Sequence, residues 1–342
     1  MNSSYCNDIC FIQDHTLDQY LFPALYGILI IISIPANSVA IFISYCEVKK
    51  KNELGVYLFS LSLADLLYTL TLPLWIYYAQ NGDDWILPPN LCNLSAFLKY
   101  LNYYTSSGFL TCISLDRYIA IVYPMRFHYL RTRRVAFFIS VFVWAFEIIS
   151  NYMILIEKET FTEQNITNHS NHTLCHDKYP LEKWQAQLNF YRVGVGYVIP
   201  LAIMVFCYQK IYQAVKHNQA TQDSDKRRIN HLLLSIVSTF FLCFTPYHVV
   251  LLLRSISEPC NCPFARRMFI PYRITTALTS INCIADPFLY CFVSETGRSD
   301  IWNMFMCVFS ASQTEIQKTQ NVPESSCSED KNVKVPETET FL

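Results

Sequence analysis

The stretch Leu21–Cys46, LFPALYGILIIISIPANSVAIFISYC, contains no Asp, Glu, Lys or Arg. As a helix it can cross a bilayer, because roughly 30 Å of hydrocarbon requires about 20 mainly apolar residues. Six further apolar stretches follow, and the seven predicted spans are Leu21–Cys46, Leu54–Ala79, Leu91–Val122, Val135–Ile156, Leu188–Tyr212, His231–Ser255 and Phe269–Val293. The predicted fold class is therefore an all-α membrane protein, a seven-transmembrane helix bundle over residues 21–293.

Charged residues are scarce in the chain as a whole. Asp, Glu, Lys and Arg make up 15% of the 342 residues, compared with roughly 25% in soluble domains. The formal net charge of -1 gives no reason to expect nucleic-acid binding. Residues 1–20 include Asp8, Asp14 and Asp18 and lack the basic start and apolar block of a cleavable signal peptide. We therefore expect the first span to act as its own insertion signal.

The basic residues between the spans predict an orientation. They follow the first and third spans and surround the connection between the fifth and sixth: Lys49, Lys50, Lys51, Arg126, Arg131, Arg133, Arg134, Lys210, Lys216, Lys226, Arg227 and Arg228. Because cytoplasmic loops carry the excess of Lys and Arg, these connections are predicted to be cytoplasmic. Residues 1–20 are then extracellular and the carboxyl terminus is cytoplasmic, as expected of a multi-pass plasma-membrane protein.

Acceptor triplets for glycosylation fall on the predicted outer side. Asn2, Asn165, Asn168 and Asn171 each begin an Asn-X-Ser/Thr triplet. Polar loops rich in Asn and Thr also produce such triplets by chance. Asn93 begins another triplet at the top of the third span, where we expect no modification.

Cysteines on the outer side predict disulfides. Cys92 and Cys175 both lie outside, where disulfides persist, and we predict that they form a bridge. Four more cysteines flank the first and last spans on the same side, namely Cys6, Cys10, Cys260 and Cys262. They fit one or two bridges between the two segments, or a local loop within the amino terminus, because spacing alone does not fix connectivity.

Several residues inside the spans need a reason to be in lipid, because a buried polar or charged group requires a partner or water. They form a set of short motifs: Asn37 after Ile34-Pro-Ala36, Leu61-Ser-Leu-Ala-Asp65, Asp116-Arg117-Tyr118, Trp144, Pro200, Tyr208, Phe240, Cys243-Phe-Thr-Pro246 and Asp286-Pro-Phe-Leu-Tyr290. With this set, from residue 20 to residue 308, the chain resembles the rhodopsin-like G-protein-coupled receptors. The resemblance implies a receptor, not an enzyme, whose partner is a heterotrimeric G protein.

The resemblance also implies an ion site in the bundle. It carries a sodium site to Asp65, Ser106, Asn282 and Asp286, where the ion would favour the resting state. The alternative for these residues is a polar cluster that only holds helices together. We expect no other cofactor.

The cytoplasmic end of the third span is the expected output site. The resemblance assigns G-protein activation to Asp116, Arg117, Tyr118, Tyr208, Pro287 and Tyr290. An ion pair with Asp116 would hold Arg117 until the helices part and Arg117 meets the G protein. Lys226–Arg228 stand where many relatives have an acidic residue, which argues against a further ion pair between Arg117 and the sixth span. Phe244 replaces the Trp that often lies below the ligand pocket.

The segment after the last span is predicted to lie at the membrane. Residues 294–309 mix apolar and polar side chains as a short amphipathic helix does, and Cys307 is a predicted palmitoylation site. Residues 310–342 have the composition of a disordered cytoplasmic tail. Its serine cluster, Ser325–Ser328, is a predicted target of a receptor kinase and a predicted docking signal for arrestin.

Longer matches relate the chain to the proton-sensing subgroup of these receptors. They are Leu21-Phe-Pro, Glu53–Leu63, Leu70–Ile76, Asp177–Trp184, Tyr272–Thr275 and Cys291–Arg298. The likeness implies activation by extracellular protons. It also implies a stimulatory G protein that raises cAMP.

Histidines provide a chemical reason for proton sensing, because a histidine has an ordinary pKa of about 6.5. His15 near the first span, His176 in the loop after the fourth span and His248 in the upper sixth span are the candidate sensors. For each the alternative is an ordinary hydrogen-bonded histidine. His169 and His172 lie among the glycosylation acceptors, and we expect them to titrate without affecting signalling.

Buried carboxyl groups provide a second route, because desolvation favours the protonated form. Glu147 in the fourth span joins Asp65 and Asp286 in this hypothesis, and a polar anchor between helices is its alternative. Arg192 and Arg273 are expected to line the ligand pocket with Phe244. There they could repel protonated histidines, pair with acids or bind the headgroup of a lipid.

The free energy of a full switch between two receptor states requires several sensors that act together. Moving a two-state receptor from 1:99 to 99:1 takes about 5.5 kcal/mol, whereas one unit of pKa difference between the states supplies about 1.4 kcal/mol. Acid activates only if the sensors have higher pKa values in the active state. A lysolipid receptor modulated by pH is the nearest alternative. A proton-coupled transporter would need internal repeats or broken helix pairs, which the sequence lacks.

Overall fold

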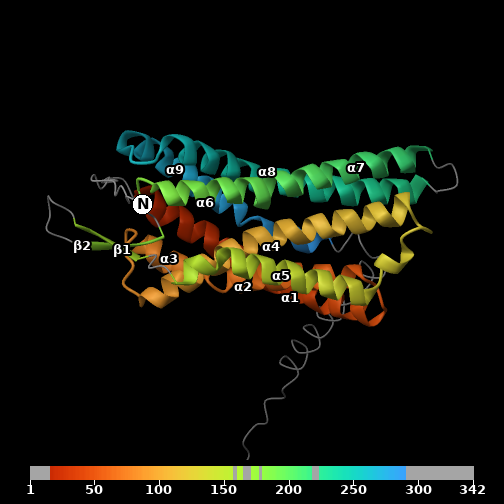
Figure 1. Ribbon diagram of the computed structural model, residues 1–342. Coiled ribbons are helices and arrows are strands. Elements are labelled where there is room, and N and C mark those ends of the chain that lie inside the picture. The colour runs from red at the N-terminus through yellow and green to blue at the C-terminus, as the bar shows by residue number, and fades with distance from the viewer. Residues whose placement is uncertain (1–15, 157–159, 165–170, 177–178, 218–222, 290–342) are drawn as a thin grey trace, which may run out of the picture. The chain divides into compact units, whose positions relative to one another are not determined.

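The computed structural model describes residues 16–156, 160–164, 171–176, 179–217 and 223–289, which are predominantly helical (Figure 1). The elements are α1 (Thr16–Lys49), α2 (Leu54–Thr69), α3 (Leu72–Gln80), α4 (Pro89–Val122), η1 (His128–Leu130), α5 (Arg133–Ile156), β1 (Thr160–Gln164), β2 (Asn171–Cys175), α6 (Lys183–Val193), the π-helical η2 (Gly194–Val198), α7 (Ile199–His217), α8 (Asp223–Ser257), α9 (Cys262–Thr279), α10 (Asn282–Ala285) and η3 (Asp286–Leu289). The seven predicted spans correspond to α1, α2 with α3, α4, α5, α6 with η2 and α7, α8, and α9 with α10 and η3.

Not all seven spans are equally apolar. Within the described residues, five segments are long and apolar enough to cross a membrane: Gln19–Lys49, Leu54–Gln80, Arg133–Tyr152, Lys183–Lys216 and Ile229–Ser257. The spans formed by α4 and α9 fall outside this group. For α4, the difference reflects where the helix lies in the bundle.

Helix α4 is polar because other helices surround it. It packs against α2, α5, α7 and α8, and its side chains at Lys99, Asn102 and Asp116 are buried. A helix covered by protein does not need the apolar surface that lipid demands. Helix α5 shows the opposite case, since Phe138 is 70% exposed and Phe142 is 69% exposed on the side that faces away from the bundle.

The helix starts differ most from the predicted ones at the sixth and seventh spans. The sixth span begins at Asp223 instead of His231, and the seventh at Cys262 instead of Phe269. Hydropathy misses both because the added turns are polar. At the seventh span, the Asn261 side chain accepts a hydrogen bond from the Phe264 N–H at 3.2 Å, which caps the helix ahead of the apolar run.

The fifth span is interrupted where it packs on α4. Pro200 lacks the N–H that would bond to the carbonyl of Gly196. That carbonyl instead accepts a hydrogen bond from Ser107 Oγ at 2.8 Å, and η2 occupies this turn. A Cβ on Gly196 would lie 2.4 Å from the ring of Tyr104, so glycine allows this close approach.

The loop between α5 and α6 folds as a hairpin that the sequence did not predict. Strands β1 and β2 pair antiparallel, with Thr160 opposite Cys175. The predicted disulfide between Cys92 and Cys175 is confirmed, with Cα atoms 5.7 Å apart. The Thr173 carbonyl accepts a hydrogen bond from the Trp85 N–H at 2.7 Å, which ties β2 to the segment before α4. We call this part of the bundle the disulfide end.

Close packing of α1 on α2 predicts a large stability effect at Gly55. A Cβ there would lie 2.9 Å from both the Ser44 carbonyl oxygen and the Val48 nitrogen, and backbone atoms cannot yield as a flexible side chain does. We expect Gly55→Ala to lower the free energy of unfolding by about 1–3 kcal/mol. Thermal unfolding of the purified protein measures the effect. Gly27→Ala is the matched control, since nothing lies within 4 Å of a Cβ at Gly27, and an equal loss in both variants would contradict the prediction.

Candidate functional site

A cluster of buried polar side chains lies in the middle of the bundle, where α1, α2, α4 and α10 meet. Asn102 of α4 donates hydrogen bonds to Asp65 Oδ1 at 2.8 Å and to Ser106 Oγ at 3.4 Å. Asn37 of α1 donates to the Cys283 carbonyl at 2.8 Å. Asp65 and Ser106 were predicted to belong to one site, whereas Asn102, which joins them, was not predicted.

Several polar atoms of this central cluster have no hydrogen-bond partner among the described residues. They are Asn37 Oδ1, Asp65 Oδ2, Asn282 Nδ2 and both carboxylate oxygens of Asp286, and all four side chains are fully buried. Buried polar groups are normally paired or hydrated. Unpaired carboxylate and amide oxygens are the ligands that small hard cations prefer. The unpaired oxygens of Asn37, Asp65 and Asp286 therefore fit a small hard cation such as sodium.

At the disulfide end, His176 contacts the buried residue Tyr100. Its Nε2 lies 2.8 Å from the Tyr100 hydroxyl, and its ring packs edge-on at 5.1 Å between centroids. The guanidinium carbon of Arg192 lies 4.1 Å from the centroid of the same Tyr100 ring. The Tyr100 and Tyr272 hydroxyls are 3.5 Å apart. One tyrosine of α4 thus contacts both a titratable imidazole and a buried guanidinium.

His248 is buried deeper in the bundle, among aromatic rings. It stacks on Tyr197 with 4.6 Å between centroids and packs edge-on against Tyr104 and Tyr247. Its Nδ1 lies 2.8 Å from the Phe244 carbonyl. Because a carbonyl oxygen only accepts, Nδ1 carries a hydrogen and a further proton would add at Nε2. Nε2 has no partner among the described residues, and the same holds for the Tyr104 and Tyr247 hydroxyls.

Glu147 and Arg192 line a crevice between α5 and the start of the fifth span. The crevice has an empty volume of about 280 Å³, counted with its solvent-open part, and Tyr104 and Asn151 also line it. Asn151 Nδ2 donates to Glu147 Oε2 at 3.5 Å, a long hydrogen bond. An acid and a cation thus line one crevice.

Arg273 has an acidic partner. Its Nη2 lies 2.9 Å from Asp83 Oδ1, and its guanidinium carbon lies 5.2 Å from the Phe22 ring centroid. The sequence left three roles open for Arg273: repelling protonated histidines, pairing with an acid, or binding a lipid headgroup. The structure shows the pairing with an acid.

A second ion pair at the disulfide end was missed. Arg254 Nε lies 2.5 Å from Glu258 Oε2, and both side chains are at most 3% exposed. The Leu181 N–H donates to Glu258 Oε1 at 3.2 Å, and the Arg254 guanidinium lies 4.1 Å from the Tyr272 ring centroid. The spacing i, i+4 between opposite charges was the available signal. The pair brings a second buried cation to the Tyr100–Tyr272 contact.

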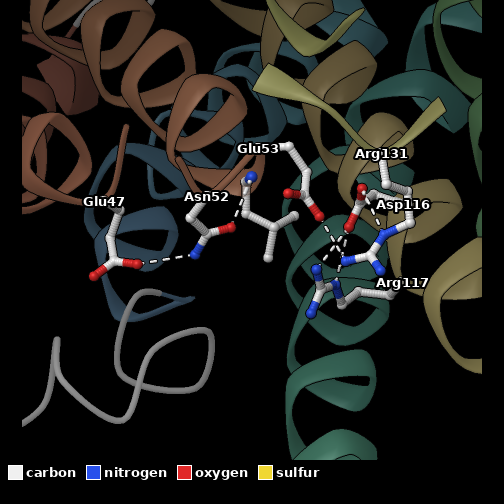
Figure 2. Close-up of polar contacts among 7 residues, drawn as sticks. Glu47, Asn52, Glu53, Asp116, Arg117 and Arg131 are labelled. Carbon is white, nitrogen blue, oxygen red and sulfur yellow. Dashed lines mark hydrogen bonds and ion pairs between the residues drawn. The ribbon is translucent and has the colours of Figure 1, made fainter. Parts of the chain in front are cut away.

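The opposite end of the bundle carries Asp116 and Arg117, and we call it the Asp116 end. Arg117 donates to Asp116 Oδ2 through Nε at 3.2 Å and Nη2 at 2.7 Å. Figure 2 shows two more side chains converging there, and Arg131 Nη2 lies 2.5 Å from Glu53 Oε1 while its Nε lies 3.5 Å from Asp116 Oδ1. Among the described residues, Arg117 has no ion pair with α8, in agreement with the basic residues there. Arg131 was predicted only as an orienting charge, and its contact with Asp116 was not predicted.

Helices α4, α7 and α8 pack closely at the Asp116 end. Ile211, Val215 and Leu233 form a buried apolar cluster against which Tyr118 and Tyr208 pack. Pro287 lies in η3 and is partly buried. With Arg117 bound to Asp116, this arrangement is the one expected of a resting receptor.

Some predicted residues lie outside the described part of the chain. They are His15, Cys6, Cys10, Asn2, Asn165, Asn168, Tyr290, Cys307 and residues 294–342. Asn171 is described only as a backbone position in β2. Cys260 and Cys262 are disulfide-bonded, and their pairing with Cys6 and Cys10 remains a prediction. Glycosylation, palmitoylation and the amphipathic helix likewise remain predictions.

Known proteins with similar sequences indicate the family of this chain. Residues 36–290 match the family model "7 transmembrane receptor (rhodopsin family)". The chain is 54% identical to human G-protein coupled receptor 65 over 87% of its own length and 90% of that protein. It is 43% identical to mouse G-protein coupled receptor 68 over 84% of its length and 77% of that protein. It is 28% identical to human probable G-protein coupled receptor 132, over 88% of its length and 77% of that protein.

Membership of this family fixes the general role. Its members are multi-pass receptors of the plasma membrane that act on heterotrimeric G proteins and are not enzymes, so the transporter alternative is excluded. The matched residues 36–290 include the central cluster, His176, His248 and the Asp116 end. The chain belongs to the rhodopsin family of seven-transmembrane, G-protein-coupled receptors.

Proposed function

We propose that this receptor is activated by protons outside the cell and raises cAMP through a stimulatory G protein. In this proposal the disulfide end faces the outside and the Asp116 end faces the cytosol, as the placement of Lys and Arg predicts. The observation that carries the proposal is the contact of His176 with Tyr100, 2.8 Å from Nε2 to the hydroxyl, beside the buried cation Arg192.

Charge around Tyr100 supports the direction of the response. His176 and Arg192 contact the same ring, with the His176 ring centroid 5.1 Å and the Arg192 guanidinium carbon 4.1 Å from its centroid. A proton on His176 places a second positive charge beside Arg192. Like charges disfavour each other, so protonation favours an arrangement in which the two groups separate. A proton that binds more favourably in the separated arrangement shifts the population toward it.

His248 supports the same direction by a different contact. A proton added at Nε2 would be a buried donor without an acceptor, since Nε2 has no partner among the described residues. An unsatisfied buried donor is costly. An arrangement that gives Nε2 an acceptor is therefore favoured by acid. Glu147, Asp65 and Asp286 complete the proposed set, together with His15 on the amino terminus.

Helix α4 can carry the change to the other end. It holds Tyr100 at the disulfide end, Asn102 and Ser106 in the central cluster, and the pair Asp116–Arg117 at the far end. A displacement of Tyr100 therefore acts on the same rigid element that holds Arg117. Release of Arg117 from Asp116 then makes it available to the G protein, with Tyr208 and Tyr290 assisting.

The test is cAMP in cells that display the receptor, over external pH from about 8 to about 6. We expect cAMP to rise on acidification, and His176→Gln to move the midpoint toward acid. The shift is toward acid because the remaining groups must supply the free energy that His176 contributed, about 1.4 kcal/mol for one unit of pKa difference between the states. Tyr100→Phe is the matched control, since it removes the hydroxyl that His176 contacts and keeps the imidazole of His176. A pH-independent cAMP level at normal surface display would end the proposal.

A lipid-activated receptor is the second candidate, because Glu147 and Arg192 face one crevice. The same titration in medium depleted of lipid separates the two. A proton receptor responds fully there, whereas a lipid receptor stays silent at every pH until a lysolipid is added.

We also propose a sodium ion in the central cluster. Asp65, Ser106, Asn282 and Asp286 would hold it, and its charge would offset the two buried carboxylates.

A further inference from the structure

Asp116 is shared unequally between two arginines. Both hydrogen bonds from Arg117 go to Oδ2, at 3.2 and 2.7 Å. The other carboxylate oxygen, Oδ1, faces Arg131 Nε at 3.5 Å. The Asp116 side chain is only 7% exposed, so it depends on these guanidinium groups for its counter-charge.

Arg131 is within ion-pair distance of Asp116 but does not hydrogen bond to it. Its Nε is buried and has no hydrogen-bond partner among the described residues. A charge-assisted N–H···O contact is usually about 2.7–2.9 Å long. A movement of about 0.6 Å would therefore convert the present contact into a full hydrogen bond. Arg131 holds an unused donor next to an unused acceptor.

Glu53 holds Arg131 in this position from the start of α2. Glu53 Oε1 lies 2.5 Å from Arg131 Nη2. The turn before it is built by Asn52, which donates to Glu47 Oε2 at 2.9 Å and accepts from the Leu54 N–H at 3.2 Å, as Figure 2 shows. The α1–α2 turn thus fixes Glu53, and Glu53 restrains the guanidinium that faces Asp116.

Release of Arg117 would leave Asp116 without its closest counter-charge. A buried carboxylate that loses its partner is strongly destabilised. The cost falls if another guanidinium takes over the carboxylate in the same movement. Arg131 is the described side chain positioned to do this.

We propose that Arg131 is a replacement counter-ion for Asp116 that takes over the carboxylate when Arg117 is released, and that Glu53 restrains this exchange. The proposal rests on the proposed orientation, in which the Asp116 end faces the G protein, and it does not depend on what activates the receptor. Arg131 and Glu53 are positioning residues, since they act on Arg117 through Asp116.

The proposal predicts opposite effects for the two members of one ion pair. Arg131→Gln removes the replacement counter-ion, so Arg117 stays on Asp116 and basal G-protein activation falls. Glu53→Gln weakens the restraint on Arg131, so Asp116 is taken over more readily and basal activation rises. We expect about a threefold change or more in each direction, within the range seen for coupled neighbours. A role limited to folding would lower the amount of receptor in both variants and leave the signal per receptor unchanged.

The measurement is G-protein activation in membranes, without added agonist and at constant alkaline pH, divided by the amount of receptor. Arg126→Gln is the matched control, because Arg126 lies in the same connection but stacks on Phe127. In the Asp116→Asn background neither substitution should change the signal further. Equal effects in both backgrounds, or changes of the same sign, would overturn the proposal.

The proposal stays testable if one variant fails to reach the membrane or if the proton response fails. If Arg131→Gln does not reach the membrane, Glu53→Gln decides alone, and a basal signal that is unchanged or lower overturns the proposal. Failure of the proton response leaves this test intact, because basal activation is measured at one pH. Failure of this test leaves the proton titration intact for the same reason.

Discussion

Combining His176→Gln, His248→Phe and Glu147→Gln is expected to remove most of the acid response while leaving the receptor at the cell surface. If each group contributes about one unit of pKa difference between the states, the three together supply about 4 kcal/mol of the roughly 5.5 kcal/mol that a full switch requires. Their loss changes the equilibrium between resting and active receptor by about a thousandfold at acid pH. The cAMP curve should therefore be nearly flat.

The three substitutions are chosen to preserve contacts. Gln at position 176 can still hydrogen bond to the Tyr100 hydroxyl, and Phe at position 248 keeps the stacking on Tyr197. The matched control is His128→Gln with His231→Gln, which removes one histidine in the connection after α4 and one near the start of α8, both far from the disulfide end. That control should titrate as the parent does. A triple variant with the parent's curve would rule out these three groups as the sensor.

Asp65→Asn is expected to have two effects of opposite sign. In sodium-free buffer the variant should be more thermally stable, because Asp65 is fully buried and its Oδ2 has no partner among the described residues. Asn keeps an oxygen that accepts from Asn102 and removes a buried charge worth several kcal/mol. In sodium the parent should gain stability and the variant should not. The expected gain is about 2.7 kcal/mol when sodium is at 100 times its Kd.

Thermal unfolding in sodium chloride and in choline chloride at equal ionic strength measures both effects. Asp83→Asn is the matched control, since Asp83 is also a buried aspartate but pairs with Arg273 at 2.9 Å. Asp83→Asn should destabilise the receptor equally in both salts and keep its response to sodium. Sodium stabilisation that persists in Asp65→Asn would exclude the proposed ion site.

The bundle was predictable because lipid demands long apolar helices, which hydropathy detects. The polar starts of α8 and α9 were not, since their first turns lie outside the apolar run and depend on caps such as Asn261. The β1–β2 hairpin was missed because its strands are only five residues long, mostly polar, and lack a sustained apolar alternation. Tertiary contacts, including the disulfide at Cys175, fix it instead.

The site was predictable where a polar residue stood alone in an apolar span. Asp65, Asp286 and Glu147 were found in this way. Asn102 was not, because α4 is polar along its length and no single residue stands out. Arg131 illustrates a different limit, since its sequence neighbours explain it fully as an orienting charge. Only the folded chain brings it within 3.5 Å of Asp116.

The polarity of α4 has a consequence for how the receptor is made. A nascent membrane protein leaves the translocon in segments, and a segment rich in buried polar groups such as Lys99 and Asn102 is poorly tolerated by hydrocarbon on its own. Helix α4 must therefore associate with partners such as α2 while synthesis is still under way. Damage to the packing of those partners would then reduce the yield of receptor during biogenesis, before any signal is received.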